Sequence, residues 1–255
     1  MSRTRLSTYT APPVEVTRAL DALRAQYEVP TAFPPEALTE AESAANAWAQ
    51  DGPARLRADG ARDARDLQLV TIDPPGSMDL DQAVLLERLL VQTDHASVPT
   101  GDAPGPVAAY RVHYAIASLA TFVTPGGALD AELRRRGETI YAPDAATPLH
   151  PEVLSHGAAS LLQDAERPAC LWTIDLDERG EVVSARVERA LVRSRARLSY
   201  AQVQDAIDGE DALPQEVPAD LPELLAEIGR LRLEREAARG GISMTTPEQV
   251  VEVTE

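Results

Sequence analysis

The sequence feature that most constrains the fold is a short apolar run followed at once by a turn and a cluster of aspartates. Residues 67–72 (LQLVTI) predict a buried strand, and Asp73 stands directly after them. The Pro-Pro-Gly sequence at 74–76 predicts a tight turn, because proline fixes φ and glycine accepts conformations that other residues avoid. We expect this turn to bring Asp79 and Asp81 back to the end of the strand.

Three carboxylates that meet at one strand end repel one another and raise one another's pKa. A divalent cation removes this conflict, and a site made of oxygen ligands alone suits Mg²⁺, with Mn²⁺ as the other suitable ion. Such an ion polarises a phosphodiester and lowers the pKa of bound water. An ordinary aspartate-rich turn stays open as the alternative. A calcium loop does not match, because Ala83 stands where the EF-hand pattern has Asp or Asn.

The composition is that expected of a soluble globular protein with one sizeable core. The chain has 255 residues, of which 44% are hydrophobic and 25% charged. It has no apolar run of about 18 residues, and no apolar run follows the N-terminal MSRTR, so we expect neither a membrane partner nor a secretory signal. Cys170 is the only cysteine, which excludes an internal disulfide and a cysteine zinc site. A cytoplasmic location fits these observations best.

The net charge of −17 argues, taken alone, against a nucleic-acid partner, because binding phosphates requires cations. A basic groove can nevertheless lie on an acidic protein, since net charge averages over the whole surface. The chain contains no lysine, so all 24 of its fixed cations are arginines. This excludes a Walker A lysine and Schiff-base chemistry. It leaves arginine, which binds phosphate with two parallel hydrogen bonds.

Periodicity and turn residues divide the chain into a helical N-terminal part and a mixed remainder. Residues 1–65 predict a small helical leader, either a packing arm or a helical nucleic-acid-binding module, that ends in a polar linker at 51–65. Residues 66–255 predict an α+β fold with mixed sheets and packed helices. Helices are expected at 14–27, from Pro35 to about Trp48, at 129–136 and at 221–239; strands at 67–72, 83–90, 107–117, 169–176, 181–200 and 250–253; and a surface loop at 94–106.

The segment TIDPPGSMDLDQA, residues 71–83, resembles the signature of the RNB family, the exoribonucleases of the ribonuclease II and ribonuclease R type. In that signature a strand ending in T-I-D leads through a short loop to D-x-D-D. The resemblance continues in the family's order at residues 110–123 (YRVHYAIASLATFV), 125–144 (PGGALDAELRRRGETIYAPD), 148–162 (PLHPEVLSHGAASLL) and 192–203 (VRSRARLSYAQV). Several spaced motifs in one order make a chance match a poor explanation.

The resemblance implies a Mg²⁺-dependent exoribonuclease that hydrolyses single-stranded RNA from its 3′ end and releases nucleoside 5′-monophosphates. It implies no role for DNA. It assigns Asp73, Asp79 and Asp81 as the catalytic, metal-site carboxylates. It also places Tyr141 and Tyr200 at two tyrosine positions near the family's catalytic centre, where they are expected to stack on bases. Without the resemblance, a half-buried structural tyrosine is the default interpretation of each.

Two substitutions and the extent of the match depart from the family pattern. Gln82 stands where the family has a fourth aspartate, and its carbonyl oxygen can still bind a cation although it brings no charge. Ser118 replaces another family aspartate. The chain resembles only the N-terminal half of the catalytic domain, so we expect it to degrade RNA slowly or not at all by itself. The alternative function is a catalytically impaired RNB-fold module for RNA binding or assembly.

Three arginines near the second tyrosine are candidates for binding the RNA backbone. Arg193, Arg195 and Arg197 alternate along a predicted strand, so we expect their side chains to share one face. A cationic stripe of this kind fits a row of phosphates. A solvated face that pairs with some of the 41 acidic residues stays open as the alternative.

Overall fold

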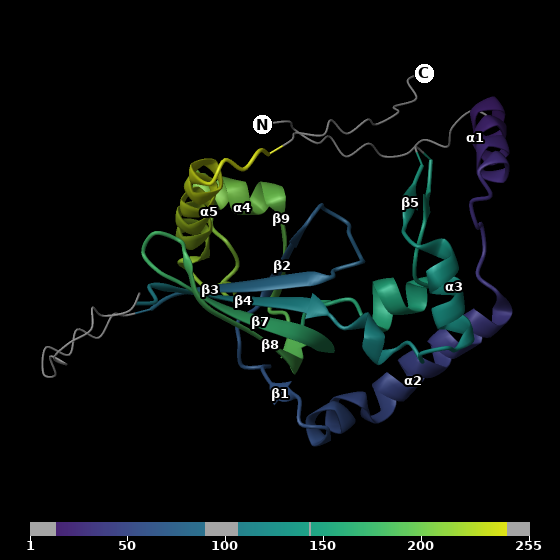
Figure 1. Ribbon diagram of the computed structural model, residues 1–255, viewed down its shortest axis with the longest axis horizontal. Coiled ribbons are helices and arrows are strands. Elements are labelled where there is room, and N and C mark those ends of the chain that lie inside the picture. The colour runs from purple at the N-terminus through teal and green to yellow at the C-terminus, as the bar shows by residue number, and fades with distance from the viewer. Residues whose placement is uncertain (1–13, 90–106, 143, 244–255) are drawn as a thin grey trace, which may run out of the picture.

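The computed structural model describes residues 14–89, 107–142 and 144–243, and within them two groups of helices flank a curved sheet (Figure 1). The helices are α1 (Val14–Gln26), α2 (Pro35–Ala58), α3 (Ala128–Arg136), α4 (Tyr200–Ile207) and α5 (Leu221–Ala238), with a 3-10 turn at Leu119–Thr121 and a π-helical turn at Val153–Ala158. The strands are β1 (Arg62–Asp63), β2 (Val70–Asp73), β3 (Gln82–Arg88), β4 (Tyr110–Ala117), β5 (Ile140–Tyr141), β6 (Ala146–Thr147), β7 (Glu166–Leu176), β8 (Val182–Arg193) and β9 (Ala196–Ser199).

The main sheet has the strand order β1-β8-β7-β4-β3-β2-β9, and β5 and β6 form a separate hairpin. The pairs β1–β8 and β2–β9 are parallel, and the other neighbours in the main sheet are antiparallel. Only Ser194 and Arg195 separate β8 from β9, although the two strands lie at different positions in the sheet. The sheet therefore curls, and the chain turns a corner at these two residues. This mixed sheet with packed helices confirms the α+β fold class.

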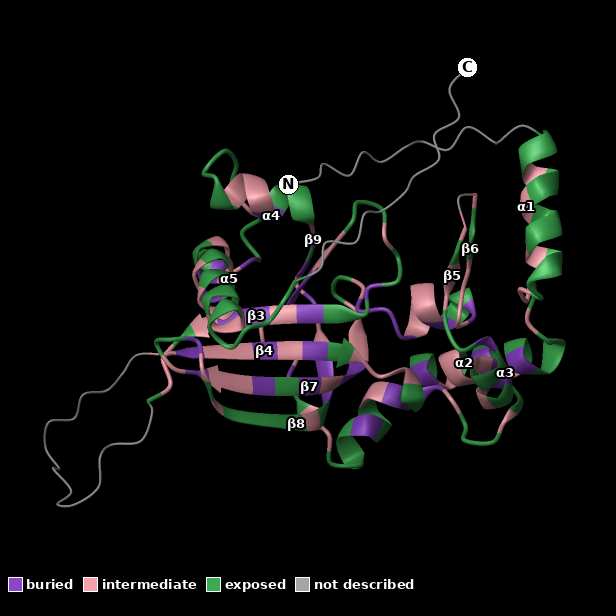
Figure 2. Ribbon diagram, turned by 45° about the horizontal axis from the view of Figure 1, so that its top comes forward, coloured by how far each residue is buried: buried purple, intermediate pink, exposed green. Residues whose placement is uncertain are grey.

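Three apolar clusters hold the elements together, and their residues are the buried segments in Figure 2. One lies against a face of the sheet and contains Leu69, Leu80 and Leu171. The second packs α4 and α5 onto the sheet, with buried residues such as Leu198 and Leu224. The third joins α2, α3 and the π-helical turn, and in it the Trp48 and Phe122 rings meet edge to face with centroids 5.7 Å apart.

The helix predicted to end near Trp48 continues through Ala58, and β1 lies in the stretch predicted to be a linker. The polar stretch at 51–65 was the signal for an earlier end, and Pro53 also removes a backbone donor inside α2. Trp48 and Leu56 are nevertheless both buried in the same cluster, so tertiary packing keeps the helix intact across the proline. β1 is extended because it pairs with β8, a contact distant in sequence.

The single strand predicted over 181–200 is two strands and the start of a helix. Tyr200 begins α4, and Ser199 caps it: the Gln202 backbone N–H donates to Ser199 Oγ at 3.2 Å, and the Ser199 N–H donates to Gln202 Oε1 at 2.8 Å. This S-x-x-Q capping box was present in the sequence and would have predicted the helix. The expected strand at 250–253 and the expected loop at 94–106 lie outside the described residues.

Within the residues that the structure describes, no helix combines the length and the apolar composition needed to cross a membrane.

Candidate active site

The aspartate loop is fixed to the sheet by a buried leucine between two exposed carboxylates. Leu80 is fully buried, and its N–H donates to Ser160 Oγ at 3.0 Å while its carbonyl accepts from the Leu161 N–H at 2.7 Å. Ser160 Oγ also donates to the Met78 carbonyl at 2.6 Å. The flanking Asp79 and Asp81 are exposed. The loop after β2 thus returns to the sheet with both carboxylates directed away from the apolar core.

Asp73 closes β2 and lies within the electrostatic reach of both loop aspartates. Burial is the largest cause that raises its pKa, and the charges of Asp81 and then Asp79 raise it further. The opposing charge of Arg197 lowers it. The Oδ2 atom of Asp73 is buried and has no hydrogen-bond partner among the described residues. The structure therefore brings the three predicted carboxylates to one region, where one buried carboxylate oxygen has no hydrogen-bond donor among the described residues.

Within the described ranges, no group of three or more His, Cys, Asp or Glu side chains lies in an arrangement that could hold a metal ion. The donor set nevertheless fits a hard cation, because it consists of carboxylate oxygens and includes the unpartnered Oδ2 of Asp73. Gln82, the first residue of β3, is exposed beside this set. Asp73, Asp79 and Asp81 are the residues that would hold such a cation.

A cavity of about 320 Å³ lies beside the two loop aspartates. Tyr141, from the β5–β6 hairpin, is one of its lining residues, and its side chain is 77% exposed. The lining also contains Glu152 and two histidines that the sequence did not suggest as site residues, His150 and His156. Burial lowers the pKa of His150, so this histidine is neutral at pH 7.

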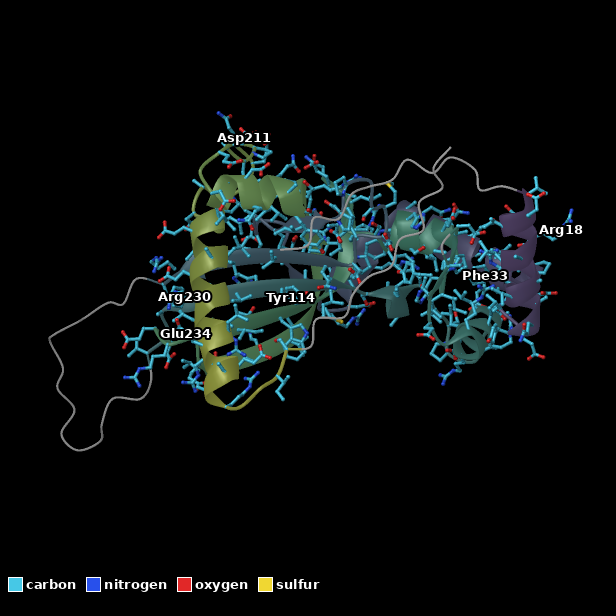
Figure 3. The ribbon with its side chains drawn as sticks, turned by 90° about the horizontal axis from the view of Figure 1, so that it is seen from above. Arg18, Phe33, Tyr114, Asp211, Arg230 and Glu234 are labelled. Carbon is cyan, nitrogen blue, oxygen red and sulfur yellow. The ribbon has the colours of Figure 1, made fainter. Side chains whose placement is uncertain are left out.

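The second predicted tyrosine lies at the start of α4, directly after β9. Tyr200 is 60% exposed and follows Ser199, whose Cα is aligned with that of Asp73. It does not line the 320 Å³ cavity. Tyr114 on β4 is labelled in Figure 3. Burial raises the pKa of its hydroxyl, and the charge of Asp81 and the neighbouring Tyr200 raise it further. Tyr114 therefore lies close enough to both Asp81 and Tyr200 to interact with them. The tyrosines predicted to stack on bases therefore lie at two positions around the carboxylates.

The three candidate arginines divide into two places. Arg197 on β9 is exposed, its Nη1 is 3.8 Å from Met78 Sδ, and of the three it is the one whose charge acts on Asp73. Arg193 and Arg195 instead line a separate cleft at the corner between β8 and β9. Their accessibility alternates with buried neighbours as the sequence predicted. The structure thus places one arginine at the carboxylates and two at a distance from them.

Comparison with known proteins finds similar sequences among bacterial ribonucleases R. Ribonuclease R of Acidithiobacillus ferrooxidans is 32% identical over 221 residues, which are 87% of this chain and 44% of that protein. Ribonuclease R of Escherichia coli (strain K12) is 30% identical over 233 residues, 90% of this chain and 26% of that protein. The chain therefore spans less than half the length of these relatives.

A solved structure shares the fold. Mycoplasma genitalium RNase R in complex with ribose methylated single-stranded RNA matches 93% of this chain and 34% of its own chain, with a TM-score of 0.74 and 21% sequence identity. The RNB domain model matches residues 61–255, which include every strand of the sheet and all three aspartates. On that match, which covers well over half of its length, the chain belongs to the RNB family.

Proposed function

We propose that this chain carries the carboxylate side of the active site of an exoribonuclease that hydrolyses single-stranded RNA from its 3′ end and releases nucleoside 5′-monophosphates. The observation that carries the proposal is the buried, unpartnered Oδ2 of Asp73 within reach of the charges of Asp79 and Asp81. Membership of the RNB family and the similarity to ribonuclease R support it. The relatives are longer, so the activity proposed is that of the complete enzyme.

Mg²⁺ is the proposed cofactor, and Asp73, Asp79 and Asp81 would hold it, with the carbonyl oxygen of Gln82 as a further ligand. When bound, the ion would polarise the phosphodiester and lower the pKa of a water molecule. The chain's own groups orient the substrate. Tyr141 and Tyr200 present exposed rings on which terminal bases can stack, and Arg197 offers a cation to a phosphate next to Asp73.

An RNA-binding module without turnover is the second candidate, and Gln82 is the observation that favours it. The residue lies beside the carboxylates, yet its amide brings no negative charge to a cation and accepts no proton at neutral pH. A site with three carboxylates in place of four holds Mg²⁺ more weakly. This candidate keeps the tyrosines and Arg197 as RNA contacts and gives up hydrolysis.

Metal binding and RNA cleavage are tested separately. Mn²⁺ binding to the 255-residue chain, followed by electron paramagnetic resonance, should be lost in Asp81→Asn and kept in the control Asp59→Asn, an exposed aspartate at the end of α2. Cleavage of 5′-labelled single-stranded RNA with Mg²⁺ is followed on gels, using this chain and an extended enzyme in which the C-terminal part of a ribonuclease R relative is joined to it.

Progressive shortening from the 3′ end, with nucleoside 5′-monophosphates as products, is the expected result for the extended enzyme. Asp81→Asn should abolish this shortening without changing the circular dichroism spectrum. Normal cleavage by Asp81→Asn would contradict the assignment of the site. RNA binding without cleavage by the extended wild-type enzyme would select the second candidate.

A further inference from the structure

The corner between β8 and β9 contains a second cluster of cations, separate from the carboxylates. A cleft of about 440 Å³ is lined there by Asp63, Arg65, Asp66, Arg193 and Arg195. Arg193 ends β8, and Arg195 belongs to the corner that follows. The other three residues belong to β1 and the turn after it. The cleft therefore lies where the curled sheet brings its first strand next to the end of β8, as Figure 1 shows for β1 and β8.

The first arginine of the cleft is already neutralised. Arg65 donates to Asp63 at 2.7 and 2.6 Å and to Glu166 at 2.6 Å. These contacts lower the pKa of Asp63 to about 2, so that its carboxylate stays ionised and paired. Asp66 is exposed, and its charge is screened by solvent. The carboxylates of the cleft are thus engaged with Arg65 or open to water.

Arg193 and Arg195 are the cations of the cleft that lack a carboxylate. Neither forms an ion pair among the described residues, although the chain has 41 acidic residues and 24 arginines. Among the described residues, the Arg195 side chain donates only to the backbone carbonyl of Arg65, from Nη2 at 2.5 Å. The Nε atoms of both arginines are buried and have no acceptor in the described part of the chain. Guanidinium donors that are held out of water without an acceptor are costly, and an anion that supplies oxygens relieves that cost.

We propose that Arg193 and Arg195 together seat one phosphate group, and that it is a backbone phosphate of the RNA strand whose 3′ end lies at Asp73. The guanidinium group suits this ligand because its planar set of donors matches two phosphate oxygens at once. The Arg195 N–H bonds to the Leu69 carbonyl at 2.7 Å, at the start of β2, whereas Asp73 ends that strand. Four residues of strand span about 13 Å, so the seated phosphate is upstream of the scissile one.

This inference rests on the proposed function for the identity of the ligand, so the test measures binding without turnover. A fluorescent single-stranded oligouridylate is titrated with the 255-residue chain by anisotropy in EDTA, at several salt concentrations. Each phosphate contact to single-stranded nucleic acid contributes about 0.7 to the slope of log affinity against log salt. The double variant Arg193→Gln/Arg195→Gln should therefore lose about 0.7 of that slope.

The matched control is Arg179→Gln/Arg189→Gln, which also removes two positive charges. Both of these arginines are exposed, and neither forms an ion pair with another described residue. It should keep the wild-type slope. Arg193→Lys/Arg195→Lys, which retains the charges, should restore most of the slope lost in the glutamine variant. Circular dichroism of each variant separates loss of fold from loss of the contact. Equal slopes in the two glutamine variants, or no RNA binding by the wild type, would overturn the proposal.

Inorganic phosphate distinguishes the two sources of the ligand. The ¹H–¹⁵N signals of the arginine Nε–H groups are recorded as phosphate is added, and the signals lost in the lysine variant belong to Arg193 and Arg195. Shifts of these signals, together with the reduced RNA slope, support a seat for a backbone phosphate. Shifts with an unchanged RNA slope would overturn the RNA assignment, because the cleft would then hold free phosphate alone. Failure of RNA cleavage leaves both readouts intact, so it is distinguishable from failure of this proposal.

Discussion

Asp73 and Ser199 are aligned partners at the ends of the parallel strands β2 and β9. The carboxylate with the raised pKa therefore lies beside the residue that caps α4, and Tyr200 is the first residue of that helix. One strand pair thus places a candidate metal ligand and a candidate stacking group next to each other. Changes at Ser199 are expected to affect RNA binding through Tyr200 as well as the stability of α4.

Asp73→Asn should stabilise the metal-free chain as the pH rises. The folded-state pKa of Asp73 is above its ordinary value of 3.8, so ionisation costs more in the folded than in the unfolded state. Below that ordinary value both forms are neutral and the variant should match the wild type. As the pH rises through the raised pKa, the wild type should lose free energy of unfolding relative to the variant. Urea unfolding in EDTA across this range measures the difference, and a gap that shrinks with pH would contradict it.

Tyr141→Ala and Tyr200→Ala should each weaken RNA binding by about 1–3 kcal/mol, because each removes an exposed aromatic face on which a base can stack. The corresponding phenylalanine variants should retain most of the affinity. Tyr27→Ala is the matched control, since that ring is 71% exposed and lies outside the carboxylate region. Anisotropy with single-stranded RNA gives the affinities. The length of the final undegraded RNA product, measured with the extended enzyme, should change in Tyr141→Ala. Unchanged RNA affinity and unchanged product length in both alanine variants would exclude stacking.

Glu132→Gln should destabilise the chain by about 3–5 kcal/mol, because it leaves the buried Arg136 without its carboxylate. The Glu132 Oε1 accepts from Arg136 Nε at 2.8 Å, with both side chains nearly inaccessible. The Arg136 guanidinium also lies 3.6 Å from the centroid of the Phe33 ring. The control Glu234→Gln breaks the exposed ion pair between Glu234 and Arg230, which are both labelled on α5 in Figure 3. It should lower the free energy of unfolding by less than about 1 kcal/mol.

The same pair gives a pH dependence of opposite sign to that of Asp73. Hydrogen bonds from Arg135, and then from Arg136, hold the pKa of Glu132 below its ordinary value of 4.5. Its contribution to the free energy of unfolding is therefore present above pH 4.5 and lost as the pH falls through the lowered pKa. Acid unfolding should accordingly be less steep in Glu132→Gln than in the wild type. Equal steepness would show that this carboxylate does not titrate with unfolding.

Ser199→Ala should cost about 1 kcal/mol, because it removes the side-chain acceptor for the Gln202 N–H at the start of α4. It should also reduce RNA affinity if Tyr200 stacks on a base, since the cap fixes the first turn of that helix. Ser199→Thr should restore both properties. Thermal unfolding and anisotropy measure the two effects, and a loss of stability with unchanged RNA affinity would assign Ser199 a structural role alone.

The parts of the fold that depend on local pattern could be predicted from the sequence. The strand before Asp73, the turn at Gly76 with φ of 89° and the convergence of the aspartates follow from residues within one short segment. What could not be predicted depends on contacts distant in sequence. β1 is extended only because β8 is beside it, and α2 continues past Pro53 because Trp48 and Leu56 share one core.

The arginines show the same limit at the site. Alternation predicts that Arg193, Arg195 and Arg197 share one face of a single strand. The chain instead leaves β8 at Arg193 and enters β9 at Ala196, so Arg193 and Arg195 line the corner cleft while Arg197 lies on β9. Nothing in the spacing of three arginines indicates such a corner. The cavity beside Asp79 was likewise not predictable, because His156 reaches it from a π-helical turn and His150 from the segment before that turn.

Leu80 gives the aspartate loop a property that concerns backbone order rather than affinity. Burying a leucine side chain contributes about 1.5–3 kcal/mol, and the loop draws this from the apolar core rather than from an ion. The backbone of the loop is therefore ordered by apolar packing and does not need a cation to hold its course. We expect the main chain from Asp79 to Asp81 to keep the same position with and without Mg²⁺.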